Sequence, residues 1–366
     1  MSKKAWILFD FDGQNHLGRL PENLQIPGCE DLSVQPEVLR GGLSDGVLTL
    51  HVTCGHLKCD ILPTRGMSIW KMWYQDEMLG WHSPVRGPVH PAFVNLAEPS
   101  GLGWLDGFDE LLVRCGLESN GAPDFDDQGR LRYPLHGRVG NKPASHVAVS
   151  IDEQTQEISI TGVVFESRFH FTKLQLTTTL TFRLGSNAVH IHDEVENLSD
   201  MASEMQMLYH VNFGAPLLEP GSQVVAAVSK LEARDPHSIA GKAQWDRYGA
   251  PQAGVPEQAF FLELRGDENS TTQTLLKNAS GTRGASLRFN VRQLPYFTLW
   301  KNTTSLADGY VTGLEPGTNF PNRRTQEGLA GRVVPLSPRG TSSFELTLAY
   351  HPTASEVAAV EKRILG

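Results

Sequence analysis

The most regular feature of the chain is an alternation of apolar and polar positions between residues 146 and 198. The segments HVAVSI, EISITGVVFE, FHFTKLQLTTTLTFRL and AVHIHDEVEN are rich in β-branched and aromatic residues, and several alternate with a period of two. The short polar stretches DEQTQ, LGSN and NLSD that separate them are typical of turns. This pattern predicts consecutive antiparallel strands, a meander, and SSFELTLAYH predicts a further strand near the end of the chain.

Helical patterns are scarce along the chain. One candidate lies around Phe108–Cys115 and another in the tail ASEVAAVEKRILG, with Thr353 or Ser355 as its N-cap. The 35 glycines and 22 prolines are spread rather than clustered, which suits a sheet protein with many turns. We therefore predict an all-β fold, a large antiparallel β-sandwich with few short helices. Residues 1–366 are expected to form a single domain, with residues 1–45 as a less regular N-terminal extension packed on it.

The stretch WILFDFDG near the start suggests a different chemistry at first sight. An apolar strand that delivers Asp-x-Asp-Gly into a loop is how haloacid-dehalogenase-like phosphatases present a carboxylate nucleophile. Such an enzyme needs a parallel α/β sheet with crossover helices, and no alternation of strands and helices follows Gly13. We therefore assign Asp10 and Asp12 to a turn between N-terminal strands.

Charge and composition narrow the range of partners. The chain has 32 Lys+Arg against 41 Asp+Glu, a formal charge of −9, which argues against a nucleic-acid surface and favours a neutral or weakly polar ligand. The opening residues contain no signal-peptide pattern, and no run of about 18 apolar residues occurs, so we expect a soluble cytoplasmic protein without membrane partners. The four cysteines lack the spacing of a zinc site or a redox motif and are expected to be free thiols.

Three stretches place polar residues where a purely structural strand would not. These residues are His136, Arg138 and Asn141 in YPLHGRVGNKPA, His210 and Asn212 in MLYHVNFGAPLL, and Glu315, Asn319, Asn322, Arg323 and Arg324 in GLEPGTNFPNRR. The last stretch is expected to be a loop that leaves the strand GYVTGL. A His and a Glu that approach one cleft from different strands could transfer protons in both directions. Each also has a structural interpretation: His210 as a core histidine, Glu315 as the end of a strand, and His136 as a loop residue.

Together these stretches resemble the aldose 1-epimerases, or galactose mutarotases, and more closely an uncharacterised bacterial branch of that superfamily. In YPLHGR, His136 matches the family's sugar-binding histidine, and in YHVNFG, His210 matches its general acid. In LEPGTNFPN, Glu315 matches the general base and Pro321 a nearby proline. The blocks LPTRGMSI, LLVRCGLESNGAP, HGRVGN, YHVNFGAPLL and GLEPGTN resemble the uncharacterised branch over roughly residues 40–350. The resemblance implies the galactose mutarotase-like supersandwich fold.

The chain departs from the family pattern at several points. Arg138 replaces the second glycine of the family's His-Gly-Gly, and Asn322 replaces the aspartate of its Pro-Asp. The sugar-binding aspartate between the acid and the base has no counterpart by motif. For the family's N-terminal arginine, Arg65 in TRG is the candidate by the pattern of the uncharacterised branch, and Arg138 is the other. The reaction type is therefore better supported than the sugar.

The implied activity is the interconversion of α and β anomers of an aldose or a related sugar. Glu315 would take the proton of the anomeric hydroxyl while a protonated His210 gives one to the ring oxygen, and the roles reverse on closure. No metal and no organic cofactor is implied. The candidate substrate-binding residues are His136, Arg65, Arg138, Asn141, Asn319 and Asp109, and Glu118 and Asn120 could join them. Trp104 or Trp300 could stack on a sugar ring.

Other interpretations remain open from the sequence. A carbohydrate-binding protein could keep the cleft without turnover, and a lyase or hydrolase could share the fold, although a hydrolase needs two carboxylates across one bond. A metal-dependent isomerase would require His136, His210 and Glu315 to converge on one ion. Arg323 and Arg324 could hold an anionic group of the substrate or could be a solvated loop pair. Neither the sugar nor the oligomeric state can be read from the sequence.

Overall fold

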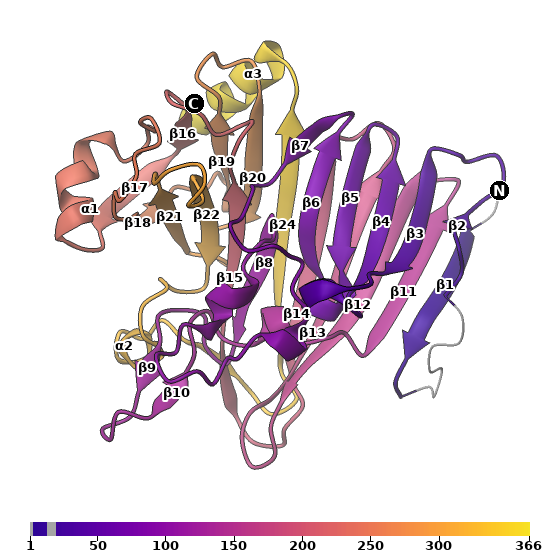
Figure 1. Ribbon diagram of the computed structural model, residues 1–366, viewed down its shortest axis with the longest axis horizontal. Helices are drawn as coiled ribbons and strands as arrows, with labels where there is room; N and C mark the ends of the chain where they lie inside the picture. The colour runs from indigo at the N-terminus through magenta and orange to yellow at the C-terminus, as the bar shows by residue number, and fades with distance from the viewer. Residues whose placement is uncertain (1–2, 13–19) are drawn as a thin grey trace.

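Two large antiparallel sheets make up most of the protein, and the computed structural model describes residues 3–12 and 20–366 (Figure 1). The nine-stranded sheet contains, in spatial order, β1 (Lys3–Asp10), β11 (His146–Asp152), β12 (Glu157–Ser167), β13 (Lys173–Arg183), β14 (Ala188–Asn197), β24 (Thr341–His351), β20 (Gly284–Asn290), β19 (Thr271–Lys277) and β16 (Gln223–Ala226). Four consecutive strands, β11 to β14, form the predicted meander, and β24 is the predicted late strand.

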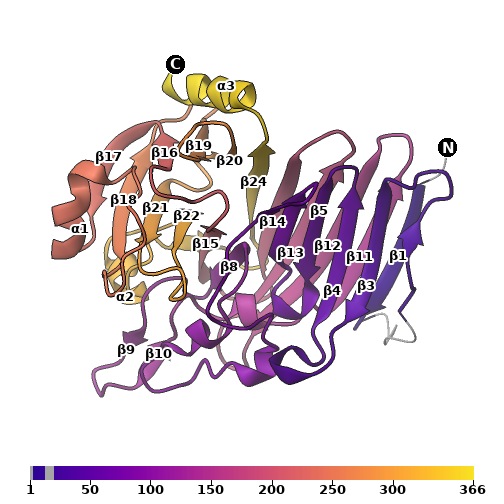
Figure 2. The same ribbon diagram turned by 45° about the horizontal axis from the view of Figure 1, so that its top comes forward.

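The larger sheet has thirteen strands and carries the residues of most interest for function. Its spatial order is β17 (Val228–Ala233), β18 (Gln258–Leu264), β21 (Tyr296–Asn302), β22 (Val311–Gly317), β15 (Ser203–Phe213), β8 (Leu112–Leu117), β6 (Ser68–Tyr74), β5 (Leu57–Leu62), β4 (Leu48–Cys54), β3 (Leu32–Val38) and β2 (Leu24–Gln25), with β7 (Glu77–Leu79) beside β6 and β23 (Val334–Leu336) beside β15. A separate pair consists of β9 (Asp124–Phe125) and β10 (Leu131–Tyr133). Figure 2 shows the strands of the two large sheets as two layers.

The core lies between the two sheets and follows directly from the alternation in the sequence. In β12 and β13 every second residue is buried, including Ile158, Ile160, Leu180 and Phe182, while the residues between them are partly exposed. These side chains belong to one continuous apolar cluster that draws on both sheets. The prediction of an all-β sandwich is confirmed.

Three α-helices are present among the described residues: α1 (Pro236–Gly241), α2 (Arg324–Leu329) and α3 (Ala354–Leu365). The predicted C-terminal helix is confirmed as α3, and Thr353 is its N-cap. Thr353 and Glu356 form a reciprocal capping box, which satisfies two backbone N–H groups that a helix start leaves without partners. One face of α3 packs against β19 and β16 (Figure 2).

The predicted helix around Phe108–Cys115 is wrong. A 3₁₀ segment, Gly103–Gly107, ends before it, and Leu112–Leu117 is strand β8. Every residue of β8 is buried, because the strand lies inside the sheet with both faces covered. A short apolar run of this kind has no polar face, so its periodicity does not separate a strand from a helix.

The N-terminal residues contribute strands to both sheets. Strand β1 pairs with β11, and β3 pairs with β4. Asp10 is the last residue of β1 and Asp12 lies in the turn after it, whereas Gly13 lies outside the described residues. Among the residues that the structure describes, no helix has the length and apolar character needed to cross a membrane.

Candidate active site

A cavity of about 440 Å³ lies over one end of the larger sheet. Its floor comes from β18, β21, β22 and β15, and its walls come from the 3₁₀ segment Gly103–Gly107 and from loops that flank β9, β10 and α2. The polar side chains that line it are His136, His210, Arg234, Glu257, Thr298, Glu315 and Asn322. The remaining lining is apolar and aromatic, as is common in small-molecule sites.

His210 and Glu315 meet in this cavity because their strands are neighbours. The register between β15 and β22 places Leu208 opposite Gly317 and Val211 opposite Leu314, so His210 and Glu315 face each other across the ladder. His210 Nε2 lies 3.2 Å from Glu315 Oε1, and both side chains are almost fully buried. The two groups are within hydrogen-bond distance but are not aligned for one, and Glu315 Oε1 has no other hydrogen-bond partner among the described residues. The sequence predicted Glu315 in a loop after the strand, but Glu315 lies within β22.

Gly313 makes the close approach of these two side chains possible. It lies two residues before Glu315 on β22, on the same face, and opposite Asn212 of β15. A Cβ atom at this position would lie 2.5 Å from Glu315 Oε1 and 3.1 Å from His210 Cε1. A side chain of any size at position 313 would thus displace the pair.

Burial shifts the pKa of both members of the pair in opposite directions. It raises the pKa of Glu315 well above its usual value, and the negative charge of Glu257 adds to the effect while Arg234 opposes it. Burial also lowers the pKa of His210 well below its usual value, helped by His136 and opposed by a hydrogen bond with Asn212. The free protein at neutral pH therefore does not favour the protonated His210 that the family resemblance implies.

His136 reaches the same cavity from the loop after β10. Its backbone has φ of 56°, a left-handed conformation that glycine adopts freely and that asparagine, aspartate and histidine adopt more often than other residues. Its ring Nδ1 lies 3.0 Å from the backbone oxygen of Asn120, which can only accept, so Nδ1 carries the hydrogen and Nε2 holds a lone pair. Burial lowers the pKa of His136 to about 4, so its ring is neutral at pH 7.

Aromatic side chains enclose the two histidines. Phe108 and Trp300 contact the His210 ring edge-on, with centroids 5.2 Å and 5.5 Å away, and Trp104 lies 4.6 Å from the His136 ring. The His136 and His210 rings are themselves 5.2 Å apart. An apolar wall beside a polar pair suits a ligand that has both a flat C–H face and hydroxyl groups.

One charged pair lies at the mouth of the cavity and was not predicted from the sequence. Arg234 follows β17 and Glu257 precedes β18, and their side chains form an ion pair at 2.9 Å. Trp300 Nε1 donates a 2.7 Å hydrogen bond to the other oxygen of Glu257. Both residues stand in loops without a recognisable motif, so only the adjacency of β17, β18 and β21 brings them to the site.

The model of a family described as a domain of unknown function, DUF4432, matches residues 44–350. No curated protein matches the chain. A crystal structure from Klebsiella pneumoniae, provisionally described as an aldose 1-epimerase, is 38% identical, with a TM-score of 0.94, over 100% of this chain and 95% of that one.

The chain belongs to the aldose 1-epimerase-like superfamily, in its DUF4432 family.

More distant structures share the fold of this superfamily. A galactose mutarotase-like protein from Clostridium acetobutylicum has 15% identity and a TM-score of 0.61, over 88% of this chain and 99% of that one. A provisionally described aldose 1-epimerase from Escherichia coli K12 has 14% identity and a TM-score of 0.54, over 84% and 99% of the two chains. The galactose mutarotase-like fold is thereby established for this member of the superfamily.

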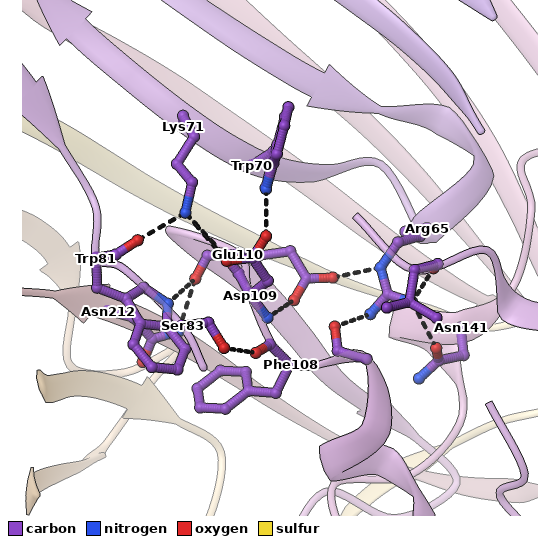
Figure 3. A network of polar contacts seen from close by, with 12 residues as sticks. Arg65, Trp70, Lys71, Trp81, Ser83, Phe108, Asp109, Glu110, Asn141 and Asn212 are labelled. Carbon is purple, nitrogen blue, oxygen red and sulfur yellow. Dashed lines mark hydrogen bonds and ion pairs between the residues drawn. The ribbon is translucent and has the colours of Figure 1, made fainter. Parts of the chain in front are cut away.

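Several residues that the resemblance marked for sugar binding do not line the cavity. Arg65 is buried, and its guanidinium donates to Glu110, to Asn141 and to the backbone oxygens of Val89 and Gly107 (Figure 3). Asp109 accepts hydrogen bonds from Trp70 Nε1 and Lys71 Nζ in the same network. Arg65 and Asp109 are therefore engaged in hydrogen bonds within the protein behind the cavity.

Other candidates also have partners within the protein. Asn319 exchanges hydrogen bonds with Asn120, and Arg138 forms a 3.0 Å ion pair with Glu118. Of the two adjacent arginines, Arg324 pairs with Glu204, and neither it nor Arg323 lines the cavity. Among the sequence-predicted residues, His136, His210, Glu315 and the flanking Asn322 are brought together.

No metal-binding arrangement is evident in the described part of the chain. Within residues 3–12 and 20–366, no three His, Cys, Asp or Glu side chains are grouped so that they could hold a metal ion. His136, His210 and Glu315 line one cavity without forming such a group.

Proposed function

We propose that the protein interconverts the α and β anomers of an aldose or a related sugar by general acid–base ring opening and closure. The observation that supports this best is the His210–Glu315 pair, which is buried in a cavity with Nε2 and Oε1 only 3.2 Å apart. The reaction needs one group that accepts a proton and one that donates a proton on the same side of a sugar ring. Two adjacent groups with opposite pKa shifts meet this requirement.

The surroundings of the pair support a sugar as the ligand. Trp104, Phe108 and Trp300 offer apolar surface for the C–H face of a ring, while the His136 Nε2 lone pair can accept a hydrogen bond from a hydroxyl group. Thr298 lies opposite Glu315 on β21, and its buried hydroxyl has no partner among the described residues.

Exchange NMR of anomeric protons tests the proposal. A pooled panel of free, phosphorylated and sulfonated sugars would be measured with the wild-type protein, Glu315→Gln and His210→Gln. We expect enzyme-dependent α/β exchange for at least one sugar, and about a 10²–10⁴-fold loss in each variant. Glu263→Gln, a half-exposed carboxylate on β18 outside the cavity, is the matched control and should keep the wild-type rate.

Two results would count against the proposal. Broadening of sugar signals without any exchange would indicate a carbohydrate-binding protein. Exchange that survives both Glu315→Gln and His210→Gln would place the chemistry elsewhere.

A further inference from the structure

Asn212 determines which nitrogen of His210 carries the hydrogen. The two residues are two positions apart on β15, so their side chains point to the same face. Asn212 Nδ2 lies 3.1 Å from the backbone oxygen of Glu110 and 3.1 Å from that of His210. Both oxygens can only accept, so the amide NH₂ must face them, and the reverse orientation would bring three oxygens together.

This orientation leaves Asn212 Oδ1 facing the ring of His210. The distance from Oδ1 to His210 Nδ1 is 2.6 Å. An amide oxygen has no hydrogen to give, so Nδ1 must donate and therefore carries the hydrogen. In neutral His210 the lone pair is then on Nε2, which is the nitrogen that faces Glu315 Oε1.

The backbone oxygen of Glu110, which accepts the hydrogen bond from Asn212, belongs to a residue that other hydrogen bonds keep in position. The backbone oxygen of Glu110 also accepts a 3.1 Å hydrogen bond from Trp81 Nε1. The Glu110 carboxylate receives Arg65 Nε at 2.6 Å and the backbone N–H of Asp109 at 3.1 Å, as the network in Figure 3 shows. A rotation of the Asn212 amide would break its hydrogen bonds with the backbone oxygens of Glu110 and His210 and with His210 Nδ1.

His210 Nε2 and Glu315 Oε1 are close enough for one proton to pass between them, although they are not aligned for a hydrogen bond. The surroundings decide which group holds this shared proton. As an ion pair, Glu315 would be a buried carboxylate whose Oε1 receives no aligned hydrogen bond from any described donor. Taking a charge out of water without such bonds is strongly unfavourable. As a neutral pair, both groups avoid this penalty.

The other ionisable groups around the pair do not reverse this preference. His136 is neutral, and burial keeps the Cys115 thiol neutral by raising its pKa. Glu257 adds negative potential at Glu315, which disfavours a second carboxylate. Arg234 acts in the opposite sense, but it is paired with Glu257 and Asp235.

We propose that Asn212 is a positioning residue that fixes His210 as the Nδ1–H tautomer, so that in the resting protein the shared proton is on Glu315. This assignment reverses the starting roles that the family resemblance implies. The reversed roles in the reaction rest on the proposed function. The position of the proton in the resting protein does not depend on it.

The resulting cycle is balanced. The Glu315 O–H gives its proton to the ring oxygen as the C1–ring oxygen bond breaks and its electron pair passes to that oxygen. His210 Nε2 takes the proton of the anomeric hydroxyl, whose O–H electrons form the C=O bond. The open-chain aldehyde then lies beside an imidazolium and a carboxylate. After rotation about C1–C2, the carboxylate takes the proton of the attacking hydroxyl and the imidazolium returns its proton to the carbonyl oxygen.

Nitrogen-15 NMR of the histidines and carbon-13 NMR of the glutamate carboxyl groups, both in labelled protein without ligand, test the two halves of the resting state. The Glu315 carboxyl signal would be assigned by its loss in Glu315→Gln; we expect it to be that of the protonated acid at pH 7, and an ionised Glu315 would overturn the proposal. The His210 signals would be assigned by their loss in His210→Gln. We expect a protonated Nδ1 and a bare Nε2 that do not change from about pH 6 to about pH 8. A hydrogen on Nε2 in this range, either as the other tautomer or as the imidazolium, would overturn the proposal.

Asn212→Leu tests the role of the amide. Without the acceptor, we expect the Nε2–H tautomer of His210 to become populated, so that a new directly bonded N–H signal appears. Asn290→Leu on β20, where the amide is hydrogen-bonded to the backbone of Asn269 and Arg292, is the matched control and should leave the His210 signals unchanged. A bare Nε2 that persists in Asn212→Leu would show that Asn212 does not set the tautomer.

The outcome can be separated from that of the proposed function. A bare Nε2 without sugar exchange would support the resting state and overturn the anomer interconversion. Sugar exchange by a protein whose resting Nε2 carries hydrogen would support the function and overturn the reversed roles.

Discussion

Arg65 and Glu110 form an ion pair whose two side chains are each only 1% exposed, with Nε and Oε1 2.6 Å apart. The pair lies behind the cavity and is connected to His210 through the backbone of Glu110 and the amide of Asn212. Removal of one partner would leave the other as an uncompensated buried charge. We expect Arg65→Met to lower the free energy of unfolding by about 3–5 kcal/mol.

Urea denaturation of Arg65→Met, Glu110→Gln and the double variant measures this effect. The double variant is expected to lose less stability than the sum of the two single variants, because it leaves no unpaired charge. Strictly additive losses would mean that the two groups are not coupled.

Gly313→Ala tests the space between Glu315 and His210. The added Cβ would lie 2.5 Å from Glu315 Oε1, so the carboxyl group must move. A displacement of about 1 Å in an active site can reduce a rate by about 10²-fold, and we expect a loss of that order in anomer exchange with the fold retained. The control is Gly249→Ala, because a Cβ there meets no atom within 4 Å. An unchanged rate in Gly313→Ala would show that the close approach is not needed.

His136 should make the stability of the protein depend on pH. Its pKa is lowered from 6.5 to about 4 by burial, so between these values the unfolded chain binds a proton that the folded protein does not. The stability that the neutral ring provides is therefore complete above pH 6.5 and decreases as the pH falls towards 4. At pH 5 the loss relative to pH 7 is up to about 2 kcal/mol.

Urea denaturation of wild type and His136→Asn at pH 7 and pH 5 isolates this contribution. Asparagine tolerates the left-handed backbone at this position but does not titrate in this range. The difference in stability between the two pH values should be smaller in the variant by up to about 2 kcal/mol. An equal difference in both proteins would mean that the folded His136 titrates normally.

Thr353→Ala tests the cap of α3. The variant loses the side-chain hydrogen bond to the Glu356 backbone, and we expect a decrease of about 0.5–2 kcal/mol in the free energy of unfolding. Ser355→Ala is the control, since the Ser355 hydroxyl is hydrogen-bonded to that of Thr353 and not to the helix backbone among the described residues, and it should change stability by less than about 0.5 kcal/mol. Equal effects of the two substitutions would argue against Thr353 as the cap.

The parts of the fold that could be predicted from the sequence are the strands and the helix that have one apolar face and one polar face. In β12 and β13 the alternation of buried and exposed positions is visible in the residues themselves, and α3 has both a cap and an apolar face. Strand β8 could not be predicted, because the sheet covers both of its faces.

The candidate site was predictable only where a motif carried the chemistry. His136, His210 and Glu315 were matched by motif; the sheet brings His210 and Glu315 to one cavity, and the loop after β10 brings His136 there. The sequence could not show that Arg65 is enclosed by the protein, because a buried support and a ligand-binding arginine use the same side chain. Arg234 and Glu257 could not be found either, since their proximity depends on the order of the strands.

The position of the first strands has a consequence for aggregation. β1 forms one edge of the nine-stranded sheet, while β2 and β3 form one end of the larger sheet. Without these three strands, the backbone N–H and C=O groups of β11 and β4 would lose their partners along one side. Unpaired edges of this kind recruit strands from other molecules. The N-terminal strands therefore cover β11 and β4, and they make β1 and the two-residue β2 the edges of the two sheets, far along both sheets from the cavity.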